Sequence, residues 1–345
     1  MAARVSHGSG KGDRIEIERT PPYNALLSQR GCRGLFSKFG QAPSPNGRSK
    51  FNLQGWSAWR DDGVSMEFGI VADVTESTLG IVELAKAVEG AGLESLLLTQ
   101  HTHVPTSRAD VMKQPDHHTD ARLLDPFVAL GAAAAVTKHL KVGTGACLPA
   151  QYDAIILAKQ VATLDHISEG RFLFGVAPGW LEEEMSSHGV DPALRRKVLR
   201  ERILAMKEIW TRDEAEFHGK FVDFDPIWQW PKPVQQPHPP VLVAGRAPHA
   251  LQRVVEYGDG WMPVVTPSTE LETHLLHLHR LSSEAGRNTP PVTAVLWEID
   301  EDLVENCATL GVARCALFAI PERATFTPML SRWTNLAETY GSGGG

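Results

Sequence analysis

The sequence contains little cysteine and no long apolar run. Its four cysteines, Cys32, Cys147, Cys307 and Cys315, form no C-x-x-C pair and match no zinc-binding spacing. Free thiols in a reducing compartment are therefore the expected state. No apolar run approaches the roughly 18 residues that a membrane span needs, and the N-terminus lacks the apolar stretch of a signal peptide. These absences predict a cytoplasmic protein that uses neither disulfides nor the membrane.

The chain also lacks an excess of positive charge. It carries 34 lysines and arginines against 41 aspartates and glutamates, a formal net charge of -7. A protein that binds nucleic acid needs a basic face for the phosphate backbone, so this balance argues against such a partner. The length of 345 residues fits one large α/β barrel with a tail, or two medium domains.

The first 65 residues differ in composition from the rest. They hold ten basic and five acidic side chains, and Gly, Ser, Pro and Asn are frequent. Neither a period of 2 nor a period of 3.6 is visible, so this segment buries too little apolar surface to offset its ordering entropy. We expect residues 1–65 to be a disordered basic extension, an extended reading frame, or an arm that docks on a partner. A barrel domain is expected over 66–340, with a flexible Gly-rich tail at 341–345.

From residue 67 onward, short apolar segments alternate with amphipathic ones. The expected strands are 67–72, 93–99, 140–148, 171–176, 240–244, 260–265, 292–299 and 312–319. The expected helices are 77–92, 126–138, 153–168, 192–211, 248–257, 268–286, 301–310 and 324–338, and residues 214–238 predict a small hairpin with a Trp/Pro loop. Eight apolar strands in strict alternation with helices predict a (β/α)₈ barrel. An open doubly wound sheet is the alternative, but no G-x-G-x-x-G follows the first strand.

In such a barrel, the residues at the carboxyl ends of the strands form the site. Those residues are Asp73, then Gln100 and His101, then Thr144, Gly145 and Ala146, then Ala177, Gly179 and Trp180, and finally Gly245, Arg246 and Ala247. Small residues let a flat fused ring approach the backbone closely. The helix expected directly after Ala247 offers free N–H groups to a phosphate. The pattern indicates a planar, phosphorylated cofactor or substrate, although ordinary tight turns have the same composition.

Several segments together resemble the luciferase-like monooxygenase superfamily, and within it the branch that uses coenzyme F420, a deazaflavin. They are ESLLLTQHTHVP at 94–105, TLDHISEGRF at 163–172, GW at 179–180, KPVQQPHPPV at 232–241 and GDGW at 258–261. The resemblance implies a luciferase-like barrel and hydride transfer between F420 and a small organic substrate. FMN with molecular oxygen is the alternative, because the same backbone can hold either ring. Proteins of this kind are often homodimers.

The resemblance also implies individual roles. His101 would lie near the reactive edge of the cofactor and relay a proton, whereas Gln100 replaces an acidic residue of the family. The Gly145–Ala146 peptide would lie behind the ring, often in the cis form. Ala177 and Pro178 depart from the family's glycine-rich turn, which Gly179 and Trp180 retain. Gly245, Arg246 and Ala247 match the phosphate-binding turn, and Asp73 and Thr144 are further expected cofactor contacts. The anionic F420 tail would reach Arg195, Arg196, Lys197 and Arg200, or these form a solvated basic face.

Two other functional readings remain open. His101 and His103, with His117 and His118, would suit a metal-dependent hydrolase, but later strand ends supply no His or Asp to complete a metal shell. A non-catalytic relative that only binds the cofactor would also explain the departures at Gln100, Ala177 and Pro178. We expect Cys147 and His166 to be packing residues, and Trp228 and Trp230 to anchor the hairpin loop.

Overall fold

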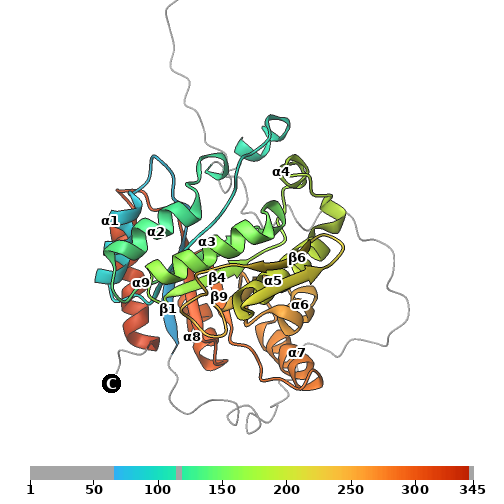
Figure 1. Cartoon of the computed structure of the whole chain (residues 1–345). Coiled ribbons are helices and arrows are strands. Elements are labelled where there is room, and N and C mark those ends of the chain that lie inside the picture. The colour runs from blue at the N-terminus through green and yellow to red at the C-terminus, as the bar shows by residue number, and fades with distance from the viewer. Residues whose placement is uncertain (1–65, 114–118, 342–345) are drawn as a thin grey trace, which may run out of the picture. The chain divides into compact units, whose positions relative to one another are not determined.

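The computed structural model describes residues 66–113 and 119–341, which form one parallel barrel (Figure 1). Its strands are β1 Glu67–Ala72, β2 Ser95–Leu98, β3 Lys141–Cys147, β4 Phe172–Val176, β7 Val241–Ala244, β8 Gly260–Met262, β9 Thr293–Leu296 and β10 Arg314–Ala319. They pair in the order β8-β7-β4-β3-β2-β1-β10-β9, and all of these pairs are parallel. Parallel bridges from Trp261 to Val292 and from Val264 to Val295 join β8 to β9 and close the barrel. The expected (β/α)₈ barrel is thus confirmed, and the tail predicted over 1–65 lies outside the described residues.

Helices cover the outside of the barrel, as the alternation predicted. They are α1 Ile81–Gly90, α2 Pro126–Val136, α3 Ala154–Ile167, α5 Arg195–Thr211, α6 His249–Tyr257, α7 Leu271–Glu284, α8 Glu301–Thr309 and α9 Phe326–Tyr340. The extra helix α4, Glu182–Ser187, follows β4 and was not expected from the sequence. Short 3₁₀ helices occupy Thr106–Arg108, Val111–Lys113, Asp120–Arg122, Pro149–Gln151 and Pro192–Leu194.

Charged side chains fix both ends of α2 and the carboxyl end of α6. The carboxylate of Asp125 accepts from the Val128 N–H at 2.9 Å, which satisfies one free donor at the start of α2. At the other end of α2, the Arg171 guanidinium donates to the carbonyls of Ala134 and Thr137 at 3.0 and 3.2 Å. Arg287 in the same way donates to carbonyls at the end of α6. A cation placed there compensates the negative end of the helix dipole.

The hairpin between α5 and β7 is held against the barrel by two buried or half-buried acids. Its strands are β5 Glu214–His218 and β6 Asp223–Trp228. Glu201 on α5 accepts from the backbone N–H groups of the hairpin turn, and Asp165 accepts from the Gln235 N–H at 2.9 Å. His166 contacts the Lys232 carbonyl at 2.7 Å, which agrees with its expected packing role. The Trp228 side chain is 77% exposed, but its indole N–H donates to Glu214 at 3.2 Å across the hairpin, which agrees with its expected anchoring role.

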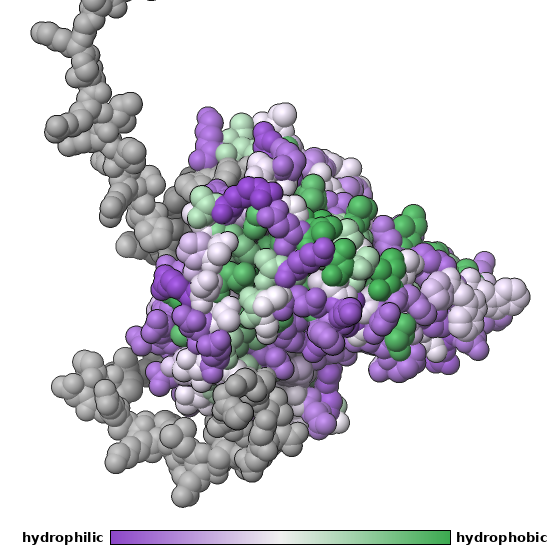
Figure 2. Space-filling model, turned by 90° about the vertical axis from the view of Figure 1, so that its left-hand side faces the viewer, coloured by the Kyte–Doolittle hydropathy of each residue, from purple (hydrophilic) through white to green (hydrophobic). Residues whose placement is uncertain are grey.

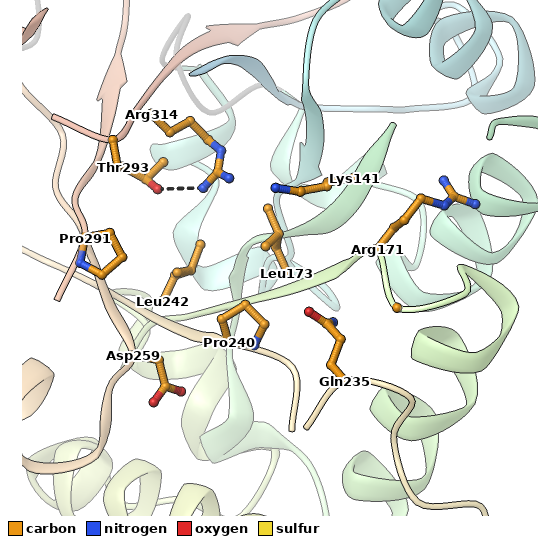
Figure 3. A pocket seen from close by; sticks show the side chains of 12 residues that line it. Lys141, Arg171, Leu173, Gln235, Pro240, Leu242, Asp259, Pro291, Thr293 and Arg314 are labelled. Carbon is orange, nitrogen blue, oxygen red and sulfur yellow. Dashed lines mark hydrogen bonds between the residues drawn. The ribbon is translucent and has the colours of Figure 1, made fainter. Parts of the chain in front are cut away.

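A cavity of about 230 Å³ lies at the amino-terminal ends of the strands. Figure 3 shows Lys141 and Arg314 pointing toward each other across it, while Arg171 turns away. Arg314 Nε is 2.7 Å from a Glu94 carboxylate oxygen, and Lys141 Nζ is 2.7 Å from the other. Burial alone would raise the pKa of Glu94, but the two cations lower it to about 2. Residues at this end of such a barrel generally serve stability. The ion pairs of Glu94 with Arg314 and Lys141 therefore stabilise the amino-terminal end of the barrel.

The outer face of α2 is unusually apolar. The helix contains no polar side chain, and Val128 is 77% exposed. Figure 2, which faces the side where α1, α2 and α9 lie, shows apolar side chains gathered among polar ones. The homodimer expected from the sequence stays a prediction.

Candidate active site

His101 follows β2 and is held by a buried carboxylate from α4. Its Nδ1 lies 2.8 Å from Oε2 of Glu184, whose side chain is fully buried. The other oxygen, Oε1, accepts from the backbone N–H and the hydroxyl of Thr102 at 2.7 and 3.0 Å. Both oxygens of Glu184 are therefore used as acceptors, and one of them fixes the orientation of the imidazole ring.

The opposite nitrogen of His101 accepts a hydrogen bond from Trp180. The indole Nε1–H of Trp180 donates to Nε2 of His101 at 3.1 Å. An indole N–H can only donate and a carboxylate can only accept. These two partners together assign a neutral imidazole whose proton is on Nδ1 and whose lone pair is on Nε2. The lone pair faces Trp180, whose side chain is 44% exposed, so it lies on the open side of the site.

Three carboxylates surround this imidazole. Burial opposes the charged form, but Glu184 above all, then Asp120 and Asp73, raise the pKa of His101. The nearer Asp120 oxygen lies 3.9 Å from His101 Nε2. In return, His101 and the Thr102 N–H lower the pKa of Glu184 to about 2, although burial alone would raise it. His101 is thus a stronger base than a free imidazole, because its protonated form meets a negative field.

Asp73 lies at the end of β1 and is closed in by hydroxyl groups. Thr99 Oγ1 donates to one carboxylate oxygen, and Thr119 Oγ1 donates to the other at 2.7 Å. Burial raises the pKa of Asp73, and these hydroxyls offset the effect only in part. The contacts tie the ends of β1 and β2 to the long loop that follows β2.

Gln100, the departure from the family's acidic residue, connects two strand ends. Its amide nitrogen donates to the Tyr152 hydroxyl at 2.8 Å, and its oxygen accepts from the Leu148 N–H at 3.0 Å. The amide donates to one partner and accepts from the other, whereas a carboxylate at this position would accept from both, from the Tyr152 hydroxyl and from the Leu148 N–H. Gln100 therefore positions the segment after β3.

The end of β3 is irregular at the expected place. The Gly145–Ala146 peptide is cis, as the resemblance implied, and the register with β4 shifts between Thr144 and Cys147. The Thr144 hydroxyl donates to the Gly175 carbonyl at 2.7 Å, which joins β3 to β4. Burial raises the pKa of the Cys147 thiol well above its usual value. Cys147 is accordingly a neutral packing residue, as expected, and not a nucleophile.

The altered turn after β4 still delivers Trp180 to His101. The Ala177 N–H donates to the Cys147 carbonyl at 2.8 Å, so this amide is used in holding β3. Gly179 then has a φ of +80°, a conformation that favours glycine. The substitution of Ala177 and Pro178 thus leaves the contact between Trp180 and His101 in place.

The turn after β7 has the features of an anion site. Gly245 has a φ of +137°, and a Cβ built there would lie 3.1 Å from Nη2 of Arg253 on α6. Arg246 is exposed on the same turn, which leads into α6 through Ala247 and Pro248. Within the described part of the chain, the buried Arg253 Nε has no hydrogen-bond partner. A phosphate fits this turn, because the site offers positive charge and an unused donor beside a glycine.

Sequence reasoning located the strand ends but missed several functional neighbours. Glu184, Thr102, Asp120, Tyr152 and Arg253 all contact or surround the predicted residues. The third acid of the run at 182–184, just after Trp180, was the available signal for Glu184. In the part of the chain that the structure describes, no group of three or more His, Cys, Asp or Glu could hold a metal. His117 and His118 lie outside that part.

The sequence also matches known proteins over most of the barrel. A family model described as luciferase-like monooxygenase matches residues 66–299. The chain belongs to the luciferase-like monooxygenase family. It is therefore a member of a family of flavin- or F420-dependent oxidoreductases and monooxygenases. None of the helices described here combines the length and apolar character that crossing a bilayer requires.

Relatives of this luciferase-like protein include a flavin-dependent enzyme. An uncharacterised protein of Mycobacterium tuberculosis is 37% identical over 269 residues, which are 75% of this chain and 93% of that protein. The oxygenase component of a flavin-dependent trigonelline monooxygenase from Acinetobacter baylyi is 37% identical over 136 residues, 39% of this chain and 38% of that protein.

Solved structures share the fold at low sequence identity. The monooxygenase RslO1 from Streptomyces bottropensis has a TM-score of 0.66 at 19% identity, over 80% of this chain and 98% of its own. A coenzyme F420 dependent tetrahydromethanopterin reductase from Methanopyrus kandleri has a TM-score of 0.60 at 17% identity, over 81% and 98%. These likenesses support the luciferase-like barrel.

Proposed function

We propose that the protein transfers hydride between coenzyme F420 and a small organic substrate, with His101 as the proton acceptor. The observation that carries the proposal is the single tautomer of His101, in which Glu184 holds Nδ1–H and Nε2 keeps its lone pair. When bound, a deazaflavin accepts or returns the hydride. The protein's own residues must then take or give the proton.

The proton step is a general-base step on a hydroxyl group. A substrate O–H near Nε2 gives its proton to His101 as hydride leaves the carbon that bears the oxygen. In the reverse direction, the imidazolium returns the proton to a carbonyl oxygen. Glu184 stabilises the imidazolium without being protonated, because its pKa of about 2 lies far below that of the ring. A hydroxyl- or carbonyl-bearing substrate follows from this arrangement.

The other expected cofactor contacts fit the same proposal. We propose that Thr144, Gly145 and Ala146 lie behind the ring and that Ala177, Gly179 and Trp180 border it. Asp73 and Gln100 hold the strand ends from which these residues project. Gly245, Arg246 and Ala247 would bind the cofactor phosphate.

A second candidate function is FMN-dependent monooxygenation. The similarity to the flavin-dependent trigonelline monooxygenase favours it. The two functions differ in what they need from His101, because oxygen activation by reduced flavin does not require a base that removes a hydroxyl proton from the substrate.

The test is binding of F420 and FMN, side by side, to the purified protein by fluorescence quenching. We expect tighter binding of F420, followed by its reduction in the presence of a panel of small alcohols. Tight FMN binding with weak F420 binding would contradict the proposal and favour the monooxygenase. Binding of neither would indicate that the turn with Ala177 and Pro178 no longer accepts a cofactor.

A further inference from the structure

Trp297 is a tryptophan that the core of the protein does not enclose. Three other tryptophans, Trp210, Trp261 and Trp333, are buried, and each donates its indole N–H to a backbone carbonyl. Trp297, in contrast, is 48% exposed, and its indole N–H has no hydrogen-bond partner among the described residues. A single exposed apolar side chain is common on protein surfaces, so the place of this ring in the barrel decides what it does.

The alternation of strand residues places Trp297 on the inner side of the barrel. In β9, Val295 belongs to the apolar cluster inside the barrel, whereas Ala294 and Leu296 belong to the cluster between the barrel and its helices. Successive side chains of a strand point to opposite faces. Trp297 follows Val295 by two residues and therefore lies on the inner side, just beyond the carboxyl end of β9.

Phe318 and Val264 extend the apolar surface around Trp297. Phe318 in β10 is partly buried against the inner cluster, and its ring meets the Trp297 ring at a centroid distance of 4.4 Å and an angle of 60°. Val264, which bridges to Val295, is partly buried against the same cluster. We call Val264, Trp297 and Phe318 the aromatic wall. It lines the barrel mouth where β8, β9 and β10 end.

The aromatic wall opens onto the same mouth as the cis peptide and His101. Phe318 pairs with Val71 across the ladder between β10 and β1, and a Cβ built at Gly145 would lie 3.3 Å from Cγ1 of Val71. Neighbouring residues thus join the wall to the strand end proposed to lie behind the cofactor ring. His101 follows β2, which pairs with β1 on the side away from β10. A substrate in the mouth therefore has the base on one side and the wall on another.

The charges nearest to His101 are negative. Glu184 and Asp120 lie 2.8 and 3.9 Å from its ring nitrogens, and Asp73 adds a third carboxylate. A phosphorylated or carboxylated substrate would be repelled near the base and would find no cation at the wall. A neutral molecule meets no such repulsion, and an apolar ring on it gains free energy when the wall removes that ring from water.

We propose that the aromatic wall binds the hydrocarbon part of the substrate, which is a neutral alcohol or ketone that carries an aromatic or other apolar ring. This inference rests on the proposed function, which places the hydroxyl or carbonyl oxygen at Nε2 of His101, and it adds what that group is attached to. The substrate ring packs on the exposed part of Trp297, while Phe318 supports the indole from the barrel side. Small alcohols reach the base but leave the wall uncovered, so they bind more weakly.

The experiment compares the oxidation of benzyl alcohol and of propan-2-ol by the protein loaded with F420. We expect kcat/KM to be higher for benzyl alcohol, mainly through a lower KM. Trp297→Ala should lower the ratio of the two kcat/KM values roughly tenfold to fiftyfold, because it removes the surface that buries the ring. Trp297→Phe should retain part of the preference. Phe318→Leu should lower the ratio about twofold to fivefold, because the indole loses its supporting ring.

A matched control and a binding measurement complete the design. Trp230→Ala removes a tryptophan of similar exposure, 55%, from the loop after β6, and should leave the ratio at its wild-type value. Calorimetric titration of acetophenone and of acetone measures binding without turnover, on the protein loaded with whichever of F420 and FMN it binds. Acetophenone should bind more tightly than acetone, and Trp297→Ala should weaken its binding about tenfold. Circular dichroism checks that the variants are folded.

The outcomes separate this inference from the proposed function. If benzyl alcohol is oxidised and Trp297→Ala leaves the ratio unchanged, the aromatic wall is wrong and the proposed function stands. An equal loss for both alcohols also overturns the wall, because Trp297 would then act on the cofactor. If no alcohol is oxidised but Trp297→Ala weakens acetophenone binding, the wall stands and the hydride-transfer proposal fails. Equal binding of acetophenone and acetone to the wild type refutes the wall whatever the reaction.

Discussion

Replacing Glu184 with glutamine tests the proposed role of His101 most directly, because it changes one atom and removes no volume. In the Glu184→Gln variant the amide oxygen must face Thr102, whose N–H and hydroxyl donate to this position at 2.7 and 3.0 Å. The amide NH₂ then faces His101 Nδ1, where the carboxylate oxygen now lies at 2.8 Å. An NH₂ group donates, so Nδ1 becomes the acceptor and the proton moves to Nε2, where it displaces the Trp180 indole N–H that donates to this nitrogen in the wild type. His101 would then present a donor where the mechanism needs a lone pair.

The expected loss follows from the general-base step. Losing a correctly oriented base typically costs roughly 10²- to 10⁴-fold in turnover. We expect Glu184→Gln to lower kcat for alcohol oxidation by about this factor, with F420 binding unchanged. The acid limb of the pH profile of kcat, where His101 becomes protonated, should also move. The carboxylate raises the pKa of His101 because it stabilises the imidazolium, so its removal lowers that pKa and shifts the limb to lower pH.

Three measurements make the reasoning refutable. His101→Ala should lower kcat by a similar factor with cofactor binding largely intact, and the double variant should be no slower than His101→Ala alone, because both changes remove one function. Nitrogen-15 NMR of the imidazole should report the Nδ1–H tautomer in the wild type and Nε2–H in Glu184→Gln. A wild-type kcat and an unmoved acid limb in Glu184→Gln, with the tautomer changed, would refute His101 as the base. Loss of cofactor binding in His101→Ala with unchanged intrinsic turnover would reverse its assignment.

Three further outcomes are expected. Trp180→Phe removes the donor that stabilises neutral His101, so the acid limb should move up by about 0.5–1 pH unit; an unchanged limb would show that the hydrogen bond has no such effect. Glu94→Gln should destabilise the fold by about 3 kcal/mol at pH 7, because the pKa of Glu94 is about 2 against an ordinary 4.5. Since that pKa is lowered, the stabilisation exists above pH 4.5 and is lost toward pH 2, so urea unfolding should show the difference between wild type and variant narrowing over this range. A constant difference would instead point to a packing defect. Finally, Cys147 should resist thiol reagents in the native protein, because it is buried with a raised pKa, and rapid labelling detected by mass spectrometry would contradict this.

The barrel could be predicted because its elements carry strong local signals. Strand β1 has the predicted bounds Glu67–Ala72, and α2 begins at Pro126, after the expected cap Asp125. Strand β8 ends at Met262 although the prediction ran to 265. Beyond Met262 only Val264 still bridges to β9. The apolar sequence therefore continues beyond the point where regular hydrogen bonding with β9 stops. Local hydrophobicity indicates burial and cannot show where pairing with a distant strand stops.

The sequence predicted a site residue only where that residue follows the end of a strand. His101 and Trp180 each follow the end of a strand, so the barrel topology brings them to the same mouth. Glu184 belongs to a short helix in a segment with no apolar period, and its contact with His101 spans 83 residues. Arg253 is similar, because nothing in the sequence of α6 distinguishes it from a solvated helix residue. Long-range contacts of this kind are set by packing, which a single sequence does not encode locally.

The hydrogen bond from Trp180 has one more consequence for substrate binding. An imidazole nitrogen without a proton has one lone pair, and at His101 Nε2 that lone pair already accepts from the indole N–H at 3.1 Å. A substrate hydroxyl must therefore displace the indole N–H before it can donate its proton there. Trp180 is 44% exposed, and its ring meets the His101 ring edge-on at a centroid distance of 5.6 Å, so its displacement exchanges this contact as well. In the proposed mechanism, the resting contact keeps His101 neutral and oriented, and its exchange for a substrate hydroxyl would bring the reacting proton to Nε2.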